Sequence, residues 1–599
     1  MHLFRHKLAS HTLLTATLVL AQGFLCLGAR SEPVAYEVTI EGIQLETLQE
    51  TLTAISETIE KREELPASLL HLRRRAQHDK EQFLRALKSQ AYYGGVVVIE
   101  IKEDQAPVQL IFHVDPGPLY IIKSVSYAPA ADYAGELPEL PGPAALGLPD
   151  GIAAKARTIL DAEKRLENML RNVGYPHGRV TGRDVLVDHA TEDVTVTYEI
   201  NLGEKADFGV ARISGLESVE EQVIARNLPW DAGQLYEKVL MDEAQKELYE
   251  TELFSTVLVK PGDEVGADGQ VPIDISVTER KHRTIGGGLQ YRTDEGASAR
   301  FRWQHRNIQG LGRRLTLDAV AGQTRSELTA TYLLNDFRRK GQNLKLSGGG
   351  GFVDYEAYSS TFLGAEAWIE RELNDNLTLG IGTRFNVTRT EQLDITQTYE
   401  LLSFPVQVFL DRSNDVLNPT EGFRLKARIE PFADVFDGDT FFLKGDLVFT
   451  HYLQLGQTPN WVLASRLGLG GIAGDSLLLI PPSERFYAGG GGSIRGYPFQ
   501  TVSPLIGNDP IGGRSLLETA VELRHRLSDR VGLVTFVDAG SAFESSWPDF
   551  GNDLRLSAGV GVRYFSPVGP LRFDVAVPLN PRKSIDSAFE FYISIGQAF

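Results

Sequence analysis

The segment Phe423-Arg424-Leu425-Lys426-Ala427-Arg428-Ile429-Glu430 alternates strictly between apolar and charged residues. Successive side chains of a β-strand point to opposite faces, so this segment would have one apolar face and one charged face. The apolar face suits lipid and the charged face suits an aqueous lumen, as in a transmembrane β-barrel. A soluble β-sandwich also buries an apolar face, so alternation alone does not separate the two.

The same period-2 alternation recurs about sixteen times in the second half of the chain. These segments lie near 284–292, 298–306, 313–321, 326–334, 343–351, 360–371, 377–388, 401–411, 422–432, 440–453, 461–472, 515–527, 531–543, 554–565, 570–579 and 589–599. An even number of antiparallel strands suits a closed barrel. We therefore expect residues 281–599 to form a membrane β-barrel of about sixteen strands.

The first thirty residues predict a secretory signal peptide. Arg5 and Lys7 precede an apolar stretch from Leu13 to Leu27, which is too short for a spanning helix. No later apolar run is long enough to cross a membrane as a helix, so any membrane span is expected to be a barrel. The single cysteine, Cys26, lies in this leader, which excludes a disulfide framework in the mature chain.

Charge and motifs argue against nucleic-acid binding and catalysis. The formal net charge is −19, whereas nucleic-acid phosphates require basic patches. The sequence has no phosphate-binding loop and no paired histidine spacing, and Gly474-Asp475-Ser476-Leu477, which spells an esterase signature, lies at the expected barrel rim. We expect no catalytic residues, no cofactor and no metal site.

The region before residue 281 contains three repeats of about 80 residues. In each repeat a helix ends at an aromatic-containing turn and the chain continues as a strand; the turns are Lys88–Gly95, Arg171–Pro176 and Tyr249–Phe254. The pattern predicts three α+β domains of order β-α-α-β-β, at 33–116, 117–204 and 206–280. The Pro/Gly/Ala-rich stretch 128–151 is expected to be a loop inserted in the second domain.

The longest connection in the expected barrel runs from Ala473 to Arg514. It contains Phe486–Phe499, with Ile494-Arg495-Gly496-Tyr497 after a run of four glycines. This stretch resembles the R-G-Y/F loop motif of the BamA and TamA superfamily of polypeptide-transporting barrels. Three more matches follow the family's order: Asp411-Arg412 with Asn418–Gly422, Thr535–Gly540, and Gly559–Arg563 with Ser566–Arg572.

The resemblance implies that the three repeats are POTRA domains in the periplasm of a Gram-negative bacterium. Three repeats and the chain length resemble the TamA branch, since BamA carries five such domains and two-partner secretion exporters carry two. The implied function is insertion or translocation of outer-membrane proteins, such as autotransporters, with a TamB-like inner-membrane-anchored partner and with outer-membrane lipid. Two alternatives stay open: export of a dedicated exoprotein, and a passive channel.

Arg495 is the residue of the loop motif that most needs a partner. An arginine folded into a barrel requires a carboxylate, and Glu522 and Asp538 are the candidates. Glu522 lies on the polar parity of its strand, and both positions match acidic residues that meet the loop arginine in the family. Arg495 either anchors a plug or takes part in conformational gating.

The resemblance also implies a weak lateral seam between the first strand, Thr284–Arg292, and the last, Phe589–Phe599. Gly286, Gly287 and Gly288 contribute no side-chain packing and would weaken strand pairing there. An incoming substrate strand could then pair with the free edge and pass into lipid. The alternative is that the same glycines only accommodate a plug or a bend in the strand.

Overall fold

A computed structural model of the 599-residue chain describes residues 33–292, 296–436, 440–549, 554–566 and 569–595. The expected signal peptide, including Cys26, and the terminal residue Phe599 lie outside the described residues. The chain divides into two compact units: the first holds the N-terminal two domains and small parts of the third, and the second holds most of the third domain and the barrel. Each unit is described by itself.

The first domain packs helices on a three-stranded sheet. Its elements are β1 (Tyr36–Glu41), α1 (Glu46–Ile55), α2 (Glu57–Glu60), α3 (Leu69–Ser89), β2 (Val96–Lys102) and β3 (Val108–Asp115). The sheet order is β1-β3-β2, with β1 parallel and β2 antiparallel to the central strand. Leu72, Phe83 and Leu87 of α3 are fully buried, because they share the apolar stripe that faces the sheet.

The second domain has the same sheet arrangement as the first, but a 3-10 turn stands in place of the first helix. Its elements are β4 (Ile121–Pro129), the 3-10 turn η1 (Pro143–Leu146), α4 (Ala156–Arg171), β5 (Arg179–Asp188) and β6 (Asp193–Asn201), with sheet order β4-β6-β5. The expected inserted loop contributes Leu146 and Leu148 to the domain's buried core. Arg165 of α4 also donates to the Leu146 carbonyl at 2.9 Å. This segment is therefore an integral part of the second domain.

The third domain repeats the arrangement. Its elements are β7 (Asp207–Ser214), α5 (Glu221–Ala225), α6 (Lys238–Glu250), β8 (Phe254–Pro261) and β9 (Gln270–Glu279), with sheet order β7-β9-β8. In all three sheets the last strand is central, and in β6 and β9 buried residues alternate with less buried ones. The fold class is as predicted: three small α/β domains resembling POTRA domains, followed by a closed barrel.

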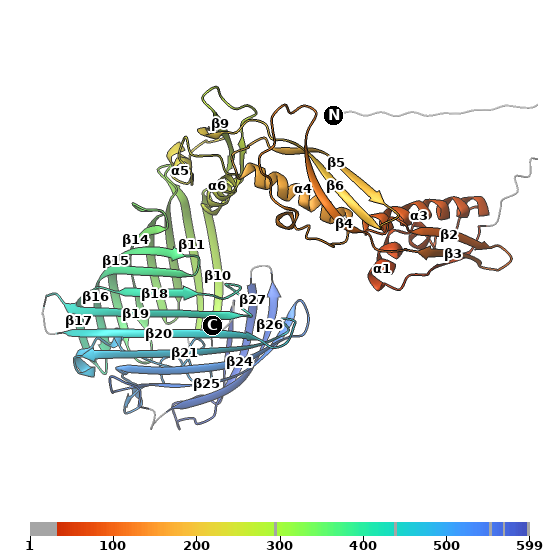
Figure 1. Cartoon of the computed structure of the whole chain (residues 1–599). Helices are drawn as coiled ribbons and strands as arrows, with labels where there is room; N and C mark the ends of the chain where they lie inside the picture. The colour runs from red at the N-terminus through yellow and green to blue at the C-terminus, as the bar shows by residue number, and fades with distance from the viewer. Residues whose placement is uncertain (1–32, 293–295, 437–439, 550–553, 567–568, 596–599) are drawn as a thin grey trace, which may run out of the picture. The chain divides into compact units, whose positions relative to one another are not determined.

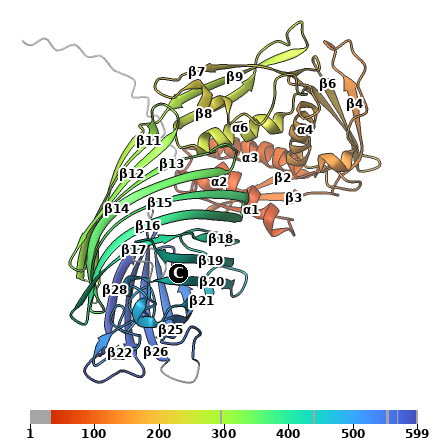
Figure 2. The ribbon, with the colours of Figure 1, turned by 90° about the vertical axis from the view of Figure 1, so that its left-hand side faces the viewer.

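The barrel is a closed antiparallel sheet (Figures 1 and 2). Its strands are β10 (Arg283–Arg292), β11 (Gly296–Ile308), β12 (Arg313–Gly322), β13 (Arg325–Leu334), β14 (Gln342–Asp354), β15 (Ser359–Asn374), β16 (Leu377–Gln392), β17 (Ile395–Ser403), β18 (Val406–Asp411), β19 (Gly422–Asp434), β20 (Phe441–Gln454), β21 (Trp461–Gly474), β24 (Ser515–Arg526), β25 (Val531–Phe543), β26 (Arg555–Ser566), β27 (Gly569–Pro578) and β28 (Glu590–Ile595).

Strands β17 and β18 occupy one position in the barrel, so the wall has sixteen strands. Both pair with β16 on one side and with β19 on the other. The strand is interrupted at Phe404-Pro405, because proline has no backbone N–H to donate to the ladder. The carbonyl of Pro405 still accepts the N–H of Gly382 at 2.9 Å.

The two faces of the wall follow the predicted alternation. On β19, Ile429 is exposed on the outer face, whereas Glu430 is buried on the lumen side. On β24, Val521 is exposed on the outside and Glu522 is buried inside. The apolar residues of the alternating pattern therefore face outward, and the charged residues face the lumen.

The barrel closes where β10 pairs with β28, and we call this contact the seam. Among the described residues β10 pairs with β28 at two positions, Tyr291↔Ile593 and Arg292↔Tyr592. On its other side β10 pairs with β11 along its whole length, from Arg283 to Arg292. These two pairings, next to the β10–β11 turn, join the first and last strands within the described residues.

The third domain is joined to the end of β11 and the turn that follows it, within the second unit. Asn307 Nδ2 donates to the Ser218 carbonyl at 3.0 Å, and Glu220 N donates to the Gly310 carbonyl at 2.9 Å. Glu279, the last residue of β9, accepts the N–H groups of residues 217–219 at 2.7–2.8 Å. This joint fixes where β10 begins.

Candidate functional site

The connection between β21 and β24, residues 475–514, is called the Arg495 loop. It carries η2 (Leu477–Leu479), η3 (Pro482–Glu484) and two short bridging strands, β22 (Leu505–Ile506) and β23 (Asp509–Pro510). Ile494 and Tyr497 are fully buried, and they pack with Ala488 and Val502 in a small apolar cluster within the loop. The loop thus has a core of its own, which presents Arg495 to the lumen side of the wall.

Arg495 reaches three carboxylates on the wall, and these four residues are called the Arg495 cluster. Its Nε and Nη2 donate to Asp538 Oδ2 and Oδ1, both at 2.7 Å. Its Nη1 donates to Glu522 Oε1 at 2.6 Å and to Asp574 Oδ2 at 3.2 Å. The arginine side chain is 2% exposed and the three carboxylates are 0% exposed.

Further cations and an aromatic ring complete the cluster's surroundings. Arg524 pairs with Glu522 at 2.8 Å, Arg572 pairs with Asp574 at 2.6 Å, and Arg563 also pairs with Asp574. The Arg495 guanidinium carbon lies 3.4 Å from the centre of the Phe536 ring, a cation–π contact. Buried charges are tolerated only when paired and hydrogen-bonded, and every charge of the Arg495 cluster meets this condition.

The residues beside Arg495 attach the loop to the last strands. Gly496 has a φ of +91°, in the left-handed region that favours glycine, and its N–H donates to the Tyr592 hydroxyl of β28 at 3.0 Å. The Tyr497 hydroxyl donates to Asn580 Oδ1 at 2.7 Å, beyond the end of β27. The motif therefore contacts both the cluster and the seam strand.

A second ionic group, called the Glu484 cluster, holds the start of the loop. Glu484 pairs with Arg384 of β16 at 3.4 Å and with Lys444 of β20 at 3.1 Å. Arg384 also pairs with Glu430 of β19 at 2.8 Å, and Arg428 pairs with the same carboxylate. The Arg495 loop thus places the Glu484 carboxylate against the wall formed by β16, β19 and β20. It places the Arg495 guanidinium against the wall formed by β24, β25 and β27.

The sequence-predicted residues fall into two groups. Arg495, Glu522 and Asp538 come together as described above, and Ile494, Gly496 and Tyr497 lie beside them. Gly286, Gly287 and Gly288 lie elsewhere, on β10, opposite Arg302, Phe301 and Arg300 of β11. A Cβ added at Gly288 would meet nothing within 4 Å, so close packing does not require this glycine.

Sequence reasoning missed Asp574, Tyr592 and Glu484. Asp574 had a usable signal, because it shares the polar parity of its strand with Arg572 and therefore faces the lumen. Tyr592 likewise alternates with the apolar residues of the last strand. Glu484 had no such signal, since it lies in a loop and its partners are 40 and 100 residues away in the sequence.

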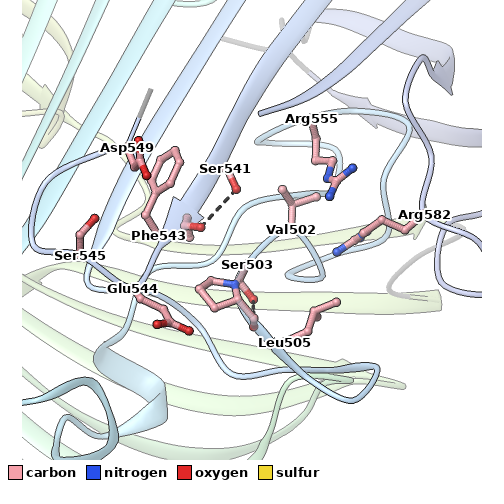
Figure 3. A pocket seen from close by; sticks show the side chains of 12 residues that line it. Val502, Ser503, Leu505, Ser541, Phe543, Glu544, Ser545, Asp549, Arg555 and Arg582 are labelled. Carbon is pink, nitrogen blue, oxygen red and sulfur yellow. Dashed lines mark hydrogen bonds between the residues drawn. The ribbon is translucent and has the colours of Figure 1, made fainter. Parts of the chain in front are cut away.

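A cavity of about 540 Å³ lies where the Arg495 loop meets the end of β25 (Figure 3). Arg555 and Arg582 lie on one side of it and Glu544 and Asp549 on the other. Arg582 is held by Asp586 at 2.5 Å and donates to the Thr501 carbonyl at 2.7 Å.

Within the described residues no group of His, Cys, Asp and Glu is arranged to hold a metal ion. In the same ranges no helix is long and apolar enough to span a membrane.

The fold and the loop define a closed β-barrel with an internally anchored loop, preceded by POTRA-like domains. Residues 307–599 match the Omp85 superfamily domain. The barrel is therefore similar to the Omp85 superfamily domain over these residues.

The chain is also similar to curated relatives and, in its fold, to a solved structure. The outer membrane protein assembly factor BamA of Nitratidesulfovibrio vulgaris is 25% identical over 476 residues, which cover 73% of this chain and 57% of BamA. The Neisseria meningitidis BamA is 21% identical over 505 residues, covering 72% and 62%. This chain thus spans less than two thirds of either relative. The crystal structure of Haemophilus ducreyi BamA lacking POTRA domains 1–3 aligns with a TM-score of 0.68 at 19% identity, covering 78% of this chain and 99% of that one.

Proposed function

We propose that this protein inserts or translocates polypeptides at the outer membrane of a Gram-negative bacterium, without catalysing a reaction. The observation that carries the proposal is the seam, where β10 and β28 pair at two positions among the described residues. If the two strands separate there, the backbone N–H and C=O groups of the β10 edge can receive a strand of another chain. The substrate strand would pair with β10 and pass sideways into outer-membrane lipid.

The glycines of β10 support this role. Ile285 and Leu289 are exposed on the outer face of β10, so Gly286 and Gly288 face the lumen and leave the inner face without a side chain at these two positions. A cavity of about 690 Å³ borders the same edge from within, lined by residues that include Gly288, Arg300, Gly491 and Ser594. There is thus space beside the seam for an incoming chain.

The finer assignment is to a TamA-like factor that assembles substrates such as autotransporters with a TamB-like partner. It rests on three POTRA-like domains before the barrel, which we place in the periplasm, where their edge strands would receive the unfolded substrate or the partner. In this scheme the Arg495 cluster holds the loop in the lumen and keeps the barrel closed until a substrate arrives.

A seam disulfide tests the insertion mechanism. Tyr291 and Ile593 are direct partners across the seam, so Tyr291→Cys with Ile593→Cys should form a disulfide that locks it. Oxidised protein should lose insertion of an autotransporter barrel into proteoliposomes, and reduction should restore it. Insertion at full rate by the locked protein would contradict lateral opening and would favour passage through the lumen.

In-cell crosslinking with copurification tests the partner. Recovery of a long TamB-like inner-membrane protein with the detergent-solubilised barrel is the expected outcome. Recovery of a secreted exoprotein alone would overturn the TamA-like assignment in favour of dedicated export.

A further inference from the structure

Tyr592 of β28 lies at the closure of the barrel and beside the Arg495 loop. Its backbone lies between two strands, with Arg292 of β10 opposite it on one side and Asp574 of β27 on the other. It is thus one of the two described residues of β28 that close the seam. Asp574, its neighbour in the wall, belongs to the Arg495 cluster.

The side chain of Tyr592 is bound to the Arg495 loop. Its hydroxyl accepts the N–H of Gly496 at 3.0 Å, and the side chain is 1% exposed. The ring lies against the glycine run, since a Cβ added at Gly491 would be 2.8 Å from the Tyr592 ring. Val534, Phe536 and Ala576 pack around it in one apolar cluster.

These contacts connect the Arg495 cluster to the seam. Phe536, which packs in the cluster of Tyr592, also lies under the Arg495 guanidinium. Displacing Arg495 from its carboxylates would therefore withdraw Gly496 and Gly491 from the Tyr592 ring. The loop contact therefore adds a side-chain attachment to the two backbone pairings, Tyr291↔Ile593 and Arg292↔Tyr592, that join β28 to β10 among the described residues.

We propose that Tyr592 is a positioning residue that couples the Arg495 loop to the seam. With the loop seated, the Gly496–Tyr592 hydrogen bond holds β28 in register with β10. With the loop released, β28 loses this support and the seam opens. The inference deepens the proposed function, and it rests on that function only in taking seam opening to be the step that admits substrate.

The coupling can be measured without substrate, by the rate of seam disulfide formation. The full-length protein carrying Tyr291→Cys and Ile593→Cys is oxidised in lipid nanodiscs, and the crosslinked fraction is followed with time. The variant Tyr592→Phe keeps the aromatic ring and removes the hydroxyl that accepts the Gly496 N–H. Tyr452→Phe is the matched control, because Tyr452 is also a buried lumen tyrosine, and its hydroxyl has no partner within the described residues.

We expect Tyr592→Phe to slow crosslinking roughly two- to tenfold, the effect of one net hydrogen bond, while Tyr452→Phe leaves the rate unchanged. Arg495→Ala should also slow it, and adding Tyr592→Phe to Arg495→Ala should change little further, because both act through one contact. Equal rates for the two tyrosine variants, or fully independent effects of Tyr592→Phe and Arg495→Ala, would overturn the inference. Unchanged heat-modifiable mobility in gels shows that each variant is folded.

The outcome is separable from that of the proposed function. If crosslinking responds as expected but the locked seam still inserts substrate, the coupling stands and lateral insertion is wrong. If insertion needs an open seam but Tyr592→Phe has no effect on crosslinking, the coupling is wrong and lateral insertion stands.

Discussion

Arg495 binds Asp538 at three points: two guanidinium nitrogens each lie 2.7 Å from a carboxylate oxygen, and the Arg495 backbone N–H lies 3.1 Å from Oδ2. Glu522, by contrast, accepts one bond from Arg495 and is shared with Arg524. Asp538 is thus the principal partner of the loop, and the two carboxylates should respond differently to substitution.

Asp538→Asn should release the Arg495 loop more than Glu522→Gln does. Removing one partner of a buried pair typically costs about 3–5 kcal/mol, because the remaining charge is left uncompensated. We expect larger ion conductance in planar bilayers for Asp538→Asn than for Glu522→Gln.

Asp318→Asn provides the control for this comparison, since Asp318 pairs with Arg302 at 2.8 Å on β11 and β12, away from the loop. Its conductance should equal that of the unaltered protein. If Asp538→Asn behaves like this control, Arg495 does not depend on Asp538.

Arg495→Lys tests whether geometry or charge holds the loop. An ammonium group retains the charge but cannot make the two parallel bonds to Asp538. Conductance should therefore fall between those of the unaltered protein and Arg495→Ala. A lysine variant indistinguishable from the unaltered protein would show that charge alone suffices.

Glu484→Gln should free the start of the loop and leave Arg384 and Lys444 with fewer counter-charges. We expect cleavage of the loop by added protease to become faster, while Glu391→Gln, at an exposed barrel position, has no effect. The charge exchange Glu484→Lys with Lys444→Glu should restore part of the protection. Absence of any rescue would mean that the cluster acts through packing and not through charge.

The joint between the third domain and the barrel should resist acid. Burial alone would raise the pKa of Glu279, but hydrogen bonds from the Ser218 hydroxyl and the N–H groups of residues 217–219 outweigh it and lower the pKa to about 2. A lowered folded-state pKa contributes stability that is fully present above the ordinary value of 4.5 and is lost as the pH falls toward about 2.

Hydrogen exchange of residues 217–220, corrected for the intrinsic pH dependence, measures this stability. Protection should begin to decline below about pH 4.5 and be lost near pH 2, and Glu279→Gln should have low protection at neutral pH. Complete loss of protection already near pH 4.5 would contradict a lowered pKa.

Local patterns predicted the barrel well because each strand carries its own signal. Alternation in Phe423–Glu430 identifies the two faces without knowledge of neighbouring strands, and the structure places Ile429 outside and Glu430 inside. The interruption at Phe404-Pro405 was also readable in principle, because proline breaks the ladder. The repeated pattern predicted three α+β domains, whereas the order of strands within each sheet comes from the structure.

The site was less predictable because it depends on the path of one long loop. Glu522 and Asp538 could be chosen from strand parity and from the family resemblance, yet nothing local shows that Asp574 shares the same arginine. The Glu484 cluster depends on where η3 lies relative to β16 and β20, which only the folded loop determines. Tyr592 required both the register of β28 and the position of Gly496.

The opposite charges at the two anchors of the Arg495 loop also bear on how the barrel assembles. A loop inserted the wrong way round would place Arg495 beside Arg384 and Lys444, and Glu484 beside the acidic residues of β24 and β25. Each misplacement brings like charges together in a confined space, so the reversed arrangement is strongly disfavoured. During folding, the walls can therefore distinguish the two ends of the loop by sign before any close packing forms.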